Sequence, residues 1–211
     1  NYLINNCVHD GRHNEALYYA EKLKNMPVTK DRKKTYDGTF FGQGILAPAK
    51  MEMAFGHWDK AAAQLELIQD KDSVQSLSNM DFKNGLLFFV KGMDAITKNK
   101  PDEAIKYANS LDAFLWRNEK QAGKDSTMQK WLQNTLNIAS LELQGCIQSE
   151  QGNEDKAIKL LQKAHKNELE LGYGEPPLYA RPVAMNLAKA YEKAKKWDKA
   201  IETYQELLKR F

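Results

Sequence analysis

One short pattern returns five times along the chain and constrains its fold more than any other feature. In each copy a turn residue is followed by a bulky or charged pair, then by an acidic residue close before an alanine, and then by an apolar helical stretch. The copies begin at Gly11, Gly56, Asn99, Gly152 and Lys195, and their alanines are Ala16, Ala61, Ala104, Ala157 and Ala200. A helical stretch also precedes each copy. Repeated units of helix, tight turn and helix indicate an α-solenoid.

The small residues of the pattern have a packing explanation. Where two helices of a hairpin cross closely, only glycine or alanine lets the backbones approach, and aromatic side chains fill the space beside them. We therefore expect the five alanines to be buried. Trp58 and Trp197 occupy the same position in two of the turns, in GHWDKA and KKWDKA. Both are expected to wedge against a neighbouring hairpin.

These residues resemble the tetratricopeptide repeat, most clearly in the last copy. Leu187, Ala188 and Tyr191 fall at the leucine, small and tyrosine positions of that repeat's first helix, and Ala200 and Tyr204 at positions of its second. Lys195 replaces the usual turn glycine. In earlier copies the matching small residues are Gly92, Gly145, Gly152, Ala157 and Ala164. The resemblance implies an all-α, right-handed α-α superhelix of about five hairpins and about ten helices.

A narrower resemblance lies in the proline-rich stretch before the last hairpin. There the chain is similar to an uncharacterised bacterial family of tetratricopeptide proteins that carries an EPP-x-aromatic-x-x-PV insert. The residues that match are Glu175, Pro176, Pro177, Tyr179, Pro182 and Val183. We interpret the stretch as a shaped spacer. Gly172 should end one helix in the left-handed conformation, and Pro182 should lie in the first turn of the next.

The spacing of the copies departs from the regular repeat. Consecutive alanines are separated by 45, 43, 53 and 43 residues, against about 34 in a tetratricopeptide array. We expect lengthened first helices and loops between repeats. The whole chain, 1–211, is read as one repeat domain with hairpins at roughly 1–26, 35–70, 75–117, 126–171 and 178–211. It is expected to be a fragment of a longer chain.

Composition excludes several classes of function. No apolar run approaches the length of about 20 residues that spans a bilayer, so membrane insertion is not expected. The net charge is only +3, and lysines alternate with acids, which does not suit nucleic-acid binding. A basic group between Lys30 and Lys34 is read as a solvated helix start. A compartment is not indicated: the chain could be cytoplasmic, or exported after removal of a leader.

No catalytic or metal-binding motif emerges from the sequence. His9 and His13 have the spacing of ligands on one helix, but Gly11 between them predicts a turn, and no acid follows as a third ligand. Neither cysteine, Cys7 or Cys146, lies in a CxxC motif. Nucleophile and phosphate-loop motifs are also missing. We expect no enzyme, no cofactor and no metal.

The resemblance implies that the first helices of the hairpins line a concave face that binds a protein or peptide. The family register places Leu86, Ile96, Cys146 and Ser149 there with the candidate residues. The candidates on the face or its rim are Phe89, Met93, Glu142, Met185, Lys189, Lys193, Tyr179 and Arg181.

Two alternatives stay open at this stage. Phe89 and Met93 could be core residues, and the chain could be an accessory, ligand-sensing domain of a larger enzyme or signalling protein instead of an interaction scaffold. Uncapped terminal repeats would offer a further surface for self-association.

Overall fold

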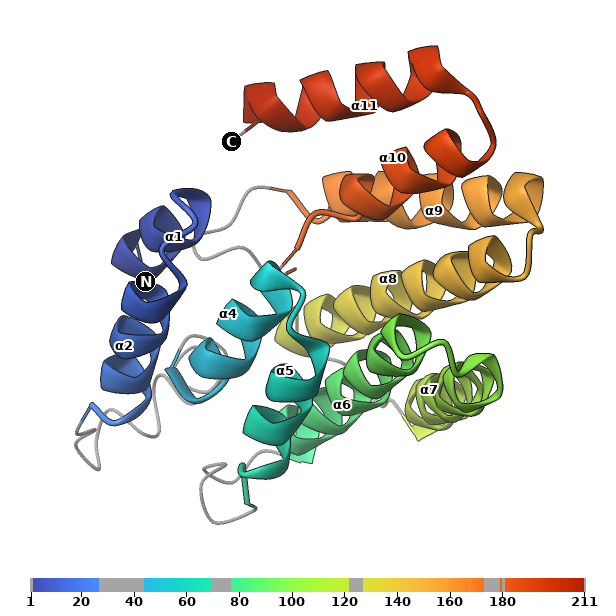
Figure 1. Cartoon of the computed structure of the whole chain (residues 1–211). Coiled ribbons are helices and arrows are strands. Elements are labelled where there is room, and N and C mark those ends of the chain that lie inside the picture. The colour runs from blue at the N-terminus through green and yellow to red at the C-terminus, as the bar shows by residue number, and fades with distance from the viewer. Residues whose placement is uncertain are drawn as a thin grey trace. The chain divides into compact units, whose positions relative to one another are not determined.

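The computed structural model describes residues 2–26, 44–69, 77–121, 127–172, 179 and 181–210. Over these residues the chain is all-α, and its helices follow one another as consecutive pairs (Figure 1). This confirms the predicted all-α fold built from helical hairpins. The pairs are α1 (Tyr2–His9) with α2 (His13–Lys24), α4 (Ala47–Phe55) with α5 (Trp58–Glu66), α6 (Leu77–Thr97) with α7 (Pro101–Gln121), α8 (Thr127–Glu150) with α9 (Glu154–Glu170), and α10 (Ala184–Lys193) with α11 (Trp197–Arg210).

The five turns inside the pairs share one backbone geometry. Each predicted turn residue has a positive φ, between 54° at Asn99 and 75° at Gly56 and Gly152. The N–H of the residue after it donates to a carbonyl five residues back, as Arg12 does to Cys7 and Lys196 to Tyr191. This bond satisfies a carbonyl that the end of the first helix would otherwise leave unpaired. The repeated pattern in the sequence therefore specifies a repeated turn.

The five alanines of the pattern are buried, as expected. Their exposed fractions run from 0% to 3%. Glycines make a similar close approach in the later hairpins. A Cβ on Gly145 would lie 2.6 Å from Cγ of Leu161, and one on Gly92 would lie 2.5 Å from Cδ2 of Leu143. The small residues thus act through packing, which the sequence predicted.

The chain divides into two compact units, and the division falls within α6. Unit 1 is Asn1–Val90 with Tyr173–Ala180, and unit 2 is Lys91–Gly172 with Arg181–Phe211. In unit 1, α4 packs against both α1 and α2. The three helices share a core of Ile4, Cys7, Ala16, Ala20, Ala47 and Met51. The first helix of one hairpin therefore packs on both helices of the hairpin before it.

The same stacking is seen in unit 2. There α10 packs against both α8 and α9, and α7 packs against α8. Asp112 of α7 accepts hydrogen bonds from Ser140 and Gln144 of α8. No helix in the described part of the chain is long and apolar enough to cross a membrane.

The stretch before the last hairpin agrees with its predicted role only in part. Gly172 follows α9 with φ 77°, which confirms the left-handed helix end. Pro182 lies two residues before α10 instead of in its first turn, because the helix begins at Ala184 with Val183 before it. Pro176 and Pro177 of the proposed spacer lie outside the described residues, as does the basic group between Lys30 and Lys34.

The two tryptophans of the turns differ. Trp58 is buried, and its ring meets that of Phe89 edge to face with centroids 5.7 Å apart. Trp197 is 57% exposed. The prediction that both wedge against a neighbouring hairpin is therefore correct for Trp58 and wrong for Trp197.

Candidate functional site

Hydrogen bonds connect the first helices of the last two hairpins in unit 2. On α8, Glu142, Cys146 and Glu150 follow one another four residues apart and so share one helix face. Asn186 of α10 donates to Oε1 of Glu142 at 2.6 Å, and Lys193 donates to Oε1 of Glu150 at 2.6 Å. These residues of α8 and α10 form one surface, which we call the α8–α10 face: Glu142, Cys146, Ser149, Glu150, Met185, Asn186, Lys189 and Lys193.

The charged side chains of this face range from buried to exposed. Glu142 is 1% exposed, whereas Lys189 and Lys193 are exposed on α10. Burial, with a smaller contribution from the Glu142 carboxylate, raises the pKa of the Cys146 thiol far above its ordinary value. The thiol is therefore protonated near neutral pH and unreactive as a nucleophile. The face therefore combines the exposed Lys189, Lys193 and Glu150 with a half-buried, protonated thiol on α8.

Six of the eight sequence-predicted site residues lie in unit 2: Met93, Glu142, Arg181, Met185, Lys189 and Lys193. Glu142 is buried, Met185 is half-buried, and the two lysines are exposed. Arg181 precedes α10 and is half-buried, and its Nε is buried with no hydrogen-bond partner among the described atoms.

Three of the predicted residues are core-like. Phe89 and Met93 of α6 are 1% and 5% exposed, in line with the packing alternative left open by the sequence. Tyr179 is 7% exposed, and its ring lies 6.2 Å from that of Phe89 within unit 1. Together with Trp58, these rings form an aromatic cluster. A partner-binding role for these three candidates stays a prediction.

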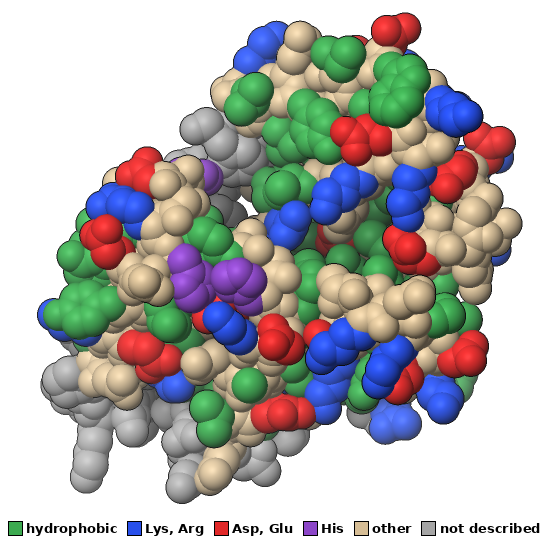
Figure 2. Space-filling model, viewed as in Figure 1, with side chains coloured by type: hydrophobic (Ala, Val, Ile, Leu, Met, Phe, Trp, Pro, Cys, Tyr) green, Lys and Arg blue, Asp and Glu red, His purple; other side chains and the backbone are tan. Residues whose placement is uncertain are grey.

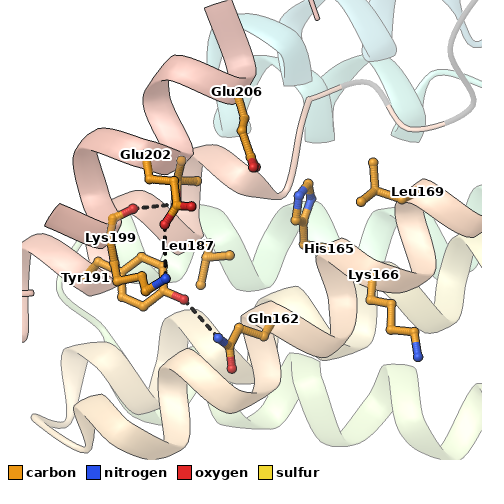
Figure 3. Close-up of a pocket in the computed structure, with 10 residues that line it drawn as sticks. Gln162, His165, Lys166, Leu169, Leu187, Tyr191, Lys199, Glu202 and Glu206 are labelled. Carbon is orange, nitrogen blue, oxygen red and sulfur yellow. Dashed lines mark hydrogen bonds and ion pairs between the residues drawn. The ribbon is translucent and has the colours of Figure 1, made fainter. Parts of the chain in front are cut away.

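A cavity of about 320 Å³ lies elsewhere in unit 2, among α9, α10 and α11 (Figure 3). Gln162 Nε2 donates to the Tyr191 hydroxyl at 2.9 Å, and Lys199 pairs with Glu202 at 3.0 Å. His165, Leu169, Leu187 and Glu206 complete much of the lining. Its wall is thus a mixture of apolar, acidic and basic groups.

A buried carboxylate contacts His165, one of the residues that line this cavity. Glu168 of α9 is 7% exposed and accepts the backbone N–H of Val183 at 3.1 Å, just before α10 begins. His165 Nδ1 lies 3.4 Å from the same carboxylate oxygen. Glu168 therefore satisfies a backbone donor at the helix start, which is otherwise left without an intrahelical acceptor.

Sequence reasoning missed this cavity. The available signal was the spacing of polar residues on two helices: Gln162, His165 and Lys166 on α9, and Lys199, Glu202 and Glu206 on α11 recur at three or four residues. Each set shares a helix face. Periodicity could identify both faces, but it could not show that they line the same cavity.

Comparison with known families finds one match. Residues 183–211 match the family described as Tetratricopeptide repeat. The matched segment holds α10 and α11 and both exposed lysines of the α8–α10 face. A tetratricopeptide repeat suggests a protein-interaction role in general. Comparison with curated proteins and with solved structures finds no match. In this last segment, and in its stacked helix pairs, the chain is similar to tetratricopeptide-repeat proteins.

Proposed function

We propose that this protein is a non-catalytic interaction scaffold that binds a peptide or a segment of a partner protein on the α8–α10 face. The observation that supports the proposal is the tetratricopeptide repeat at 183–211, whose first helix packs against α8 and carries exposed lysines. Stacked first helices present an extended surface suited to a polypeptide.

Lys189 is the residue that best fits a contact with a partner. Its side chain is exposed on α10, between half-buried Met185 and Lys193, four residues away on either side. Lys193 is already paired with Glu150. Among the described residues, no ion pair involves Lys189. An acidic side chain of a bound peptide would pair with it, while an apolar side chain would rest against Met185.

The mixed character of the surface agrees with a polypeptide ligand. Figure 2 shows basic, acidic and hydrophobic side chains interspersed on the side turned to the viewer, with no extended field of one charge. A nucleic-acid backbone would favour a continuous basic surface. A relationship to the bacterial family with the EPP insert is a further part of this proposal and rests on the sequence alone.

A second candidate function is the sensing of a small ligand by the α9–α11 cavity. Its volume of about 320 Å³ lies at the low end of the range for small-molecule sites. The lining offers Lys199, Glu202 and His165 as groups that fix an orientation. This function suits an accessory domain of a larger enzyme or signalling protein.

The test is affinity purification with charge-reversed variants. Wild-type protein, Lys189→Glu and Lys163→Glu are immobilised and exposed to a lysate of the source cells at low salt. Lys163 is an exposed lysine of α9, away from the α8–α10 face, and provides a matched control. Partners that bind wild type and Lys163→Glu are then purified, and their dissociation constants are measured.

The scaffold proposal expects Lys189→Glu to weaken binding at least about tenfold, which a lost charge-assisted contact of 1.4 kcal/mol or more produces. Equal binding by all three proteins would place the contact elsewhere and contradict the proposal. Binding that is lost only when Lys199 and Glu202 are replaced by alanine would favour the ligand cavity.

A further inference from the structure

Unit 1 brings two histidines and a buried glutamate into one cluster, although they come from different parts of the sequence. His13 is the first residue of α2, Glu52 lies in α4, and His57 lies in the turn between α4 and α5. His13 Nε2 lies 2.9 Å from Oε2 of Glu52, and His57 Nδ1 lies 2.8 Å from the same oxygen. One ligand atom from each residue lies within 4.8 Å of the other two.

The local backbone positions all three side chains. Gly56 ends α4 with φ 75°, and the N–H of His57 donates to the carbonyl of Glu52 itself at 2.9 Å. This turn carries the His57 imidazole back over the last turn of α4. The packing of α2 against α4 brings His13 to the same place. The repeated hairpin geometry, and the stacking of one hairpin on the next, therefore build the cluster.

Phe55 restrains both imidazole rings. Its ring meets His13 edge to face at 5.0 Å and stacks with His57 at 5.9 Å, while the two imidazoles lie 4.8 Å apart. The third group is fixed by burial, since the Glu52 side chain is only 3% exposed. The imidazoles are 22% and 39% exposed, so an ion has access from solvent. Figure 2 shows histidine side chains together on this surface.

We propose that His13, Glu52 and His57 bind a divalent transition-metal ion, with Zn²⁺ as the ion that fits best. Two imidazoles and one carboxylate form a donor set that zinc uses with water in the fourth position. In a tetrahedral site with bonds of about 2.0–2.1 Å, ligand atoms lie about 3.3 Å apart. The two nitrogen–oxygen separations of 2.9 and 2.8 Å are close to that value, and the two nitrogens, which lie within 4.8 Å of each other, would draw together on the ion. Imidazole donors disfavour Mg²⁺ and Ca²⁺, which prefer oxygen ligands.

An outer contact supports this assignment. Nδ1 of His13 lies 3.4 Å from the side-chain oxygen of Asn14. With the metal on Nε2, the ring proton resides on Nδ1 and is directed toward that oxygen. Histidines that ligate metals usually donate their other N–H in this way, which fixes the tautomer and the ring orientation. From the sequence, only the pair of His9 and His13 had the spacing of metal ligands, and the turn between them argued against a site. Glu52 and His57 come from the next hairpin, and their approach to His13 is not visible in the sequence.

Zinc binding is measured by titration calorimetry on protein without a polyhistidine tag, in a buffer that does not chelate metal. We expect saturable binding of one Zn²⁺ per chain and none of Mg²⁺. His57→Ala and Glu52→Gln should each weaken zinc binding at least about tenfold, because one of three ligands is lost or neutralised. His9→Ala provides the matched control and should bind like wild type, because this exposed histidine lies outside the cluster.

A second measurement does not depend on the folding of a variant. Proton–nitrogen correlation spectra of the wild-type histidine side chains identify the nitrogens that bind zinc. The proposal expects Nε2 of His13 and Nδ1 of His57 to shift together on zinc addition. Failure of wild type to bind zinc would overturn it and leave a purely hydrogen-bonded cluster. Equal binding by His57→Ala and wild type, with circular dichroism showing both folded, would also overturn it.

Discussion

The turn between α4 and α5 and the turn between α10 and α11 have almost the same sequence and the same backbone, but different surroundings. Gly56 and Lys195 both have a positive φ, and each following N–H bonds back to the end of the preceding helix. Trp58 is nevertheless 6% exposed, whereas Trp197 is 57% exposed. Local sequence thus determines the turn, and the elements packed on it determine what each side chain does.

The residue after the turn position shows the same difference. His57 contacts the buried Glu52 and takes part in the histidine cluster of unit 1. Lys196, at the equivalent position, forms a surface ion pair at 2.9 Å with Asp155 of α9. One position of the repeat therefore serves a candidate metal site in one hairpin and links neighbouring hairpins in the other.

The largest expected difference between the two turns comes from their tryptophans. Trp58→Ala should lower the free energy of unfolding by about 3–5 kcal/mol, because it removes a buried ring packed on Phe89. Trp197→Ala should lower it by about 1 kcal/mol or less, since the ring is mostly in solvent. Denaturant unfolding followed by circular dichroism measures both. Equal losses would contradict the difference in packing.

A smaller effect tests the backbone that the turns share. Gly56→Ala places a Cβ in the left-handed conformation and should cost about 1–2 kcal/mol of stability. The same denaturant unfolding measures this loss. A neutral result would indicate that the turn does not require a positive φ.

The converse substitution at the other turn should stabilise. Lys195→Gly relieves a left-handed lysine, and we expect a gain of about 0.5–1 kcal/mol, limited by the greater entropy of glycine in the unfolded chain. Lys195→Ala keeps the backbone strain while removing the amine, and it should resemble wild type. Thermal unfolding compares the three proteins, and a gain in the alanine variant alone would assign the effect to charge.

The smallest effect concerns the ion pair of the second turn. The hydrogen bond and charge of Lys196 hold the pKa of Asp155 below its ordinary value. Lys196→Ala should raise that pKa toward the ordinary value, as a carboxyl titration by nuclear magnetic resonance would show. Because the pKa is lowered in the folded state, the pair stabilises above the unfolded pKa of aspartate and is lost as pH falls through the folded value.

That contribution should be weak and sensitive to salt, because the Asp155 side chain is 86% exposed. An unchanged Asp155 pKa in the variant would show that Lys196 does not contact it in solution.

Sequence predicted the features that depend on neighbours along the chain. The turn at Gly56, the burial of Ala61 and the pairing of helices follow from local backbone and packing rules. Asn99 and Lys195 adopt the same turn without glycine, which the spacing of the motif indicated better than residue type did.

Features that join distant residues could not be predicted in this way. His13 and Glu52 lie 39 positions apart, and their contact depends on how α2 stacks on α4. The exposure assigned to Phe89 came from a regular repeat register. Within unit 1 the rings of Trp58 and Tyr179 lie against that residue, and a periodic pattern on one helix does not reveal what covers it.

The central claim is that one repeated motif produces the same hairpin turn, even where glycine is missing. The coupling between amide and α protons, with the nuclear Overhauser effect inside each residue, reports φ at Asn99 and Lys195 in solution. The account predicts the left-handed signature at both residues, with φ near 54° and 56°. Right-handed helical values at either residue would mean that the helix continues through the motif, and they would contradict the claim.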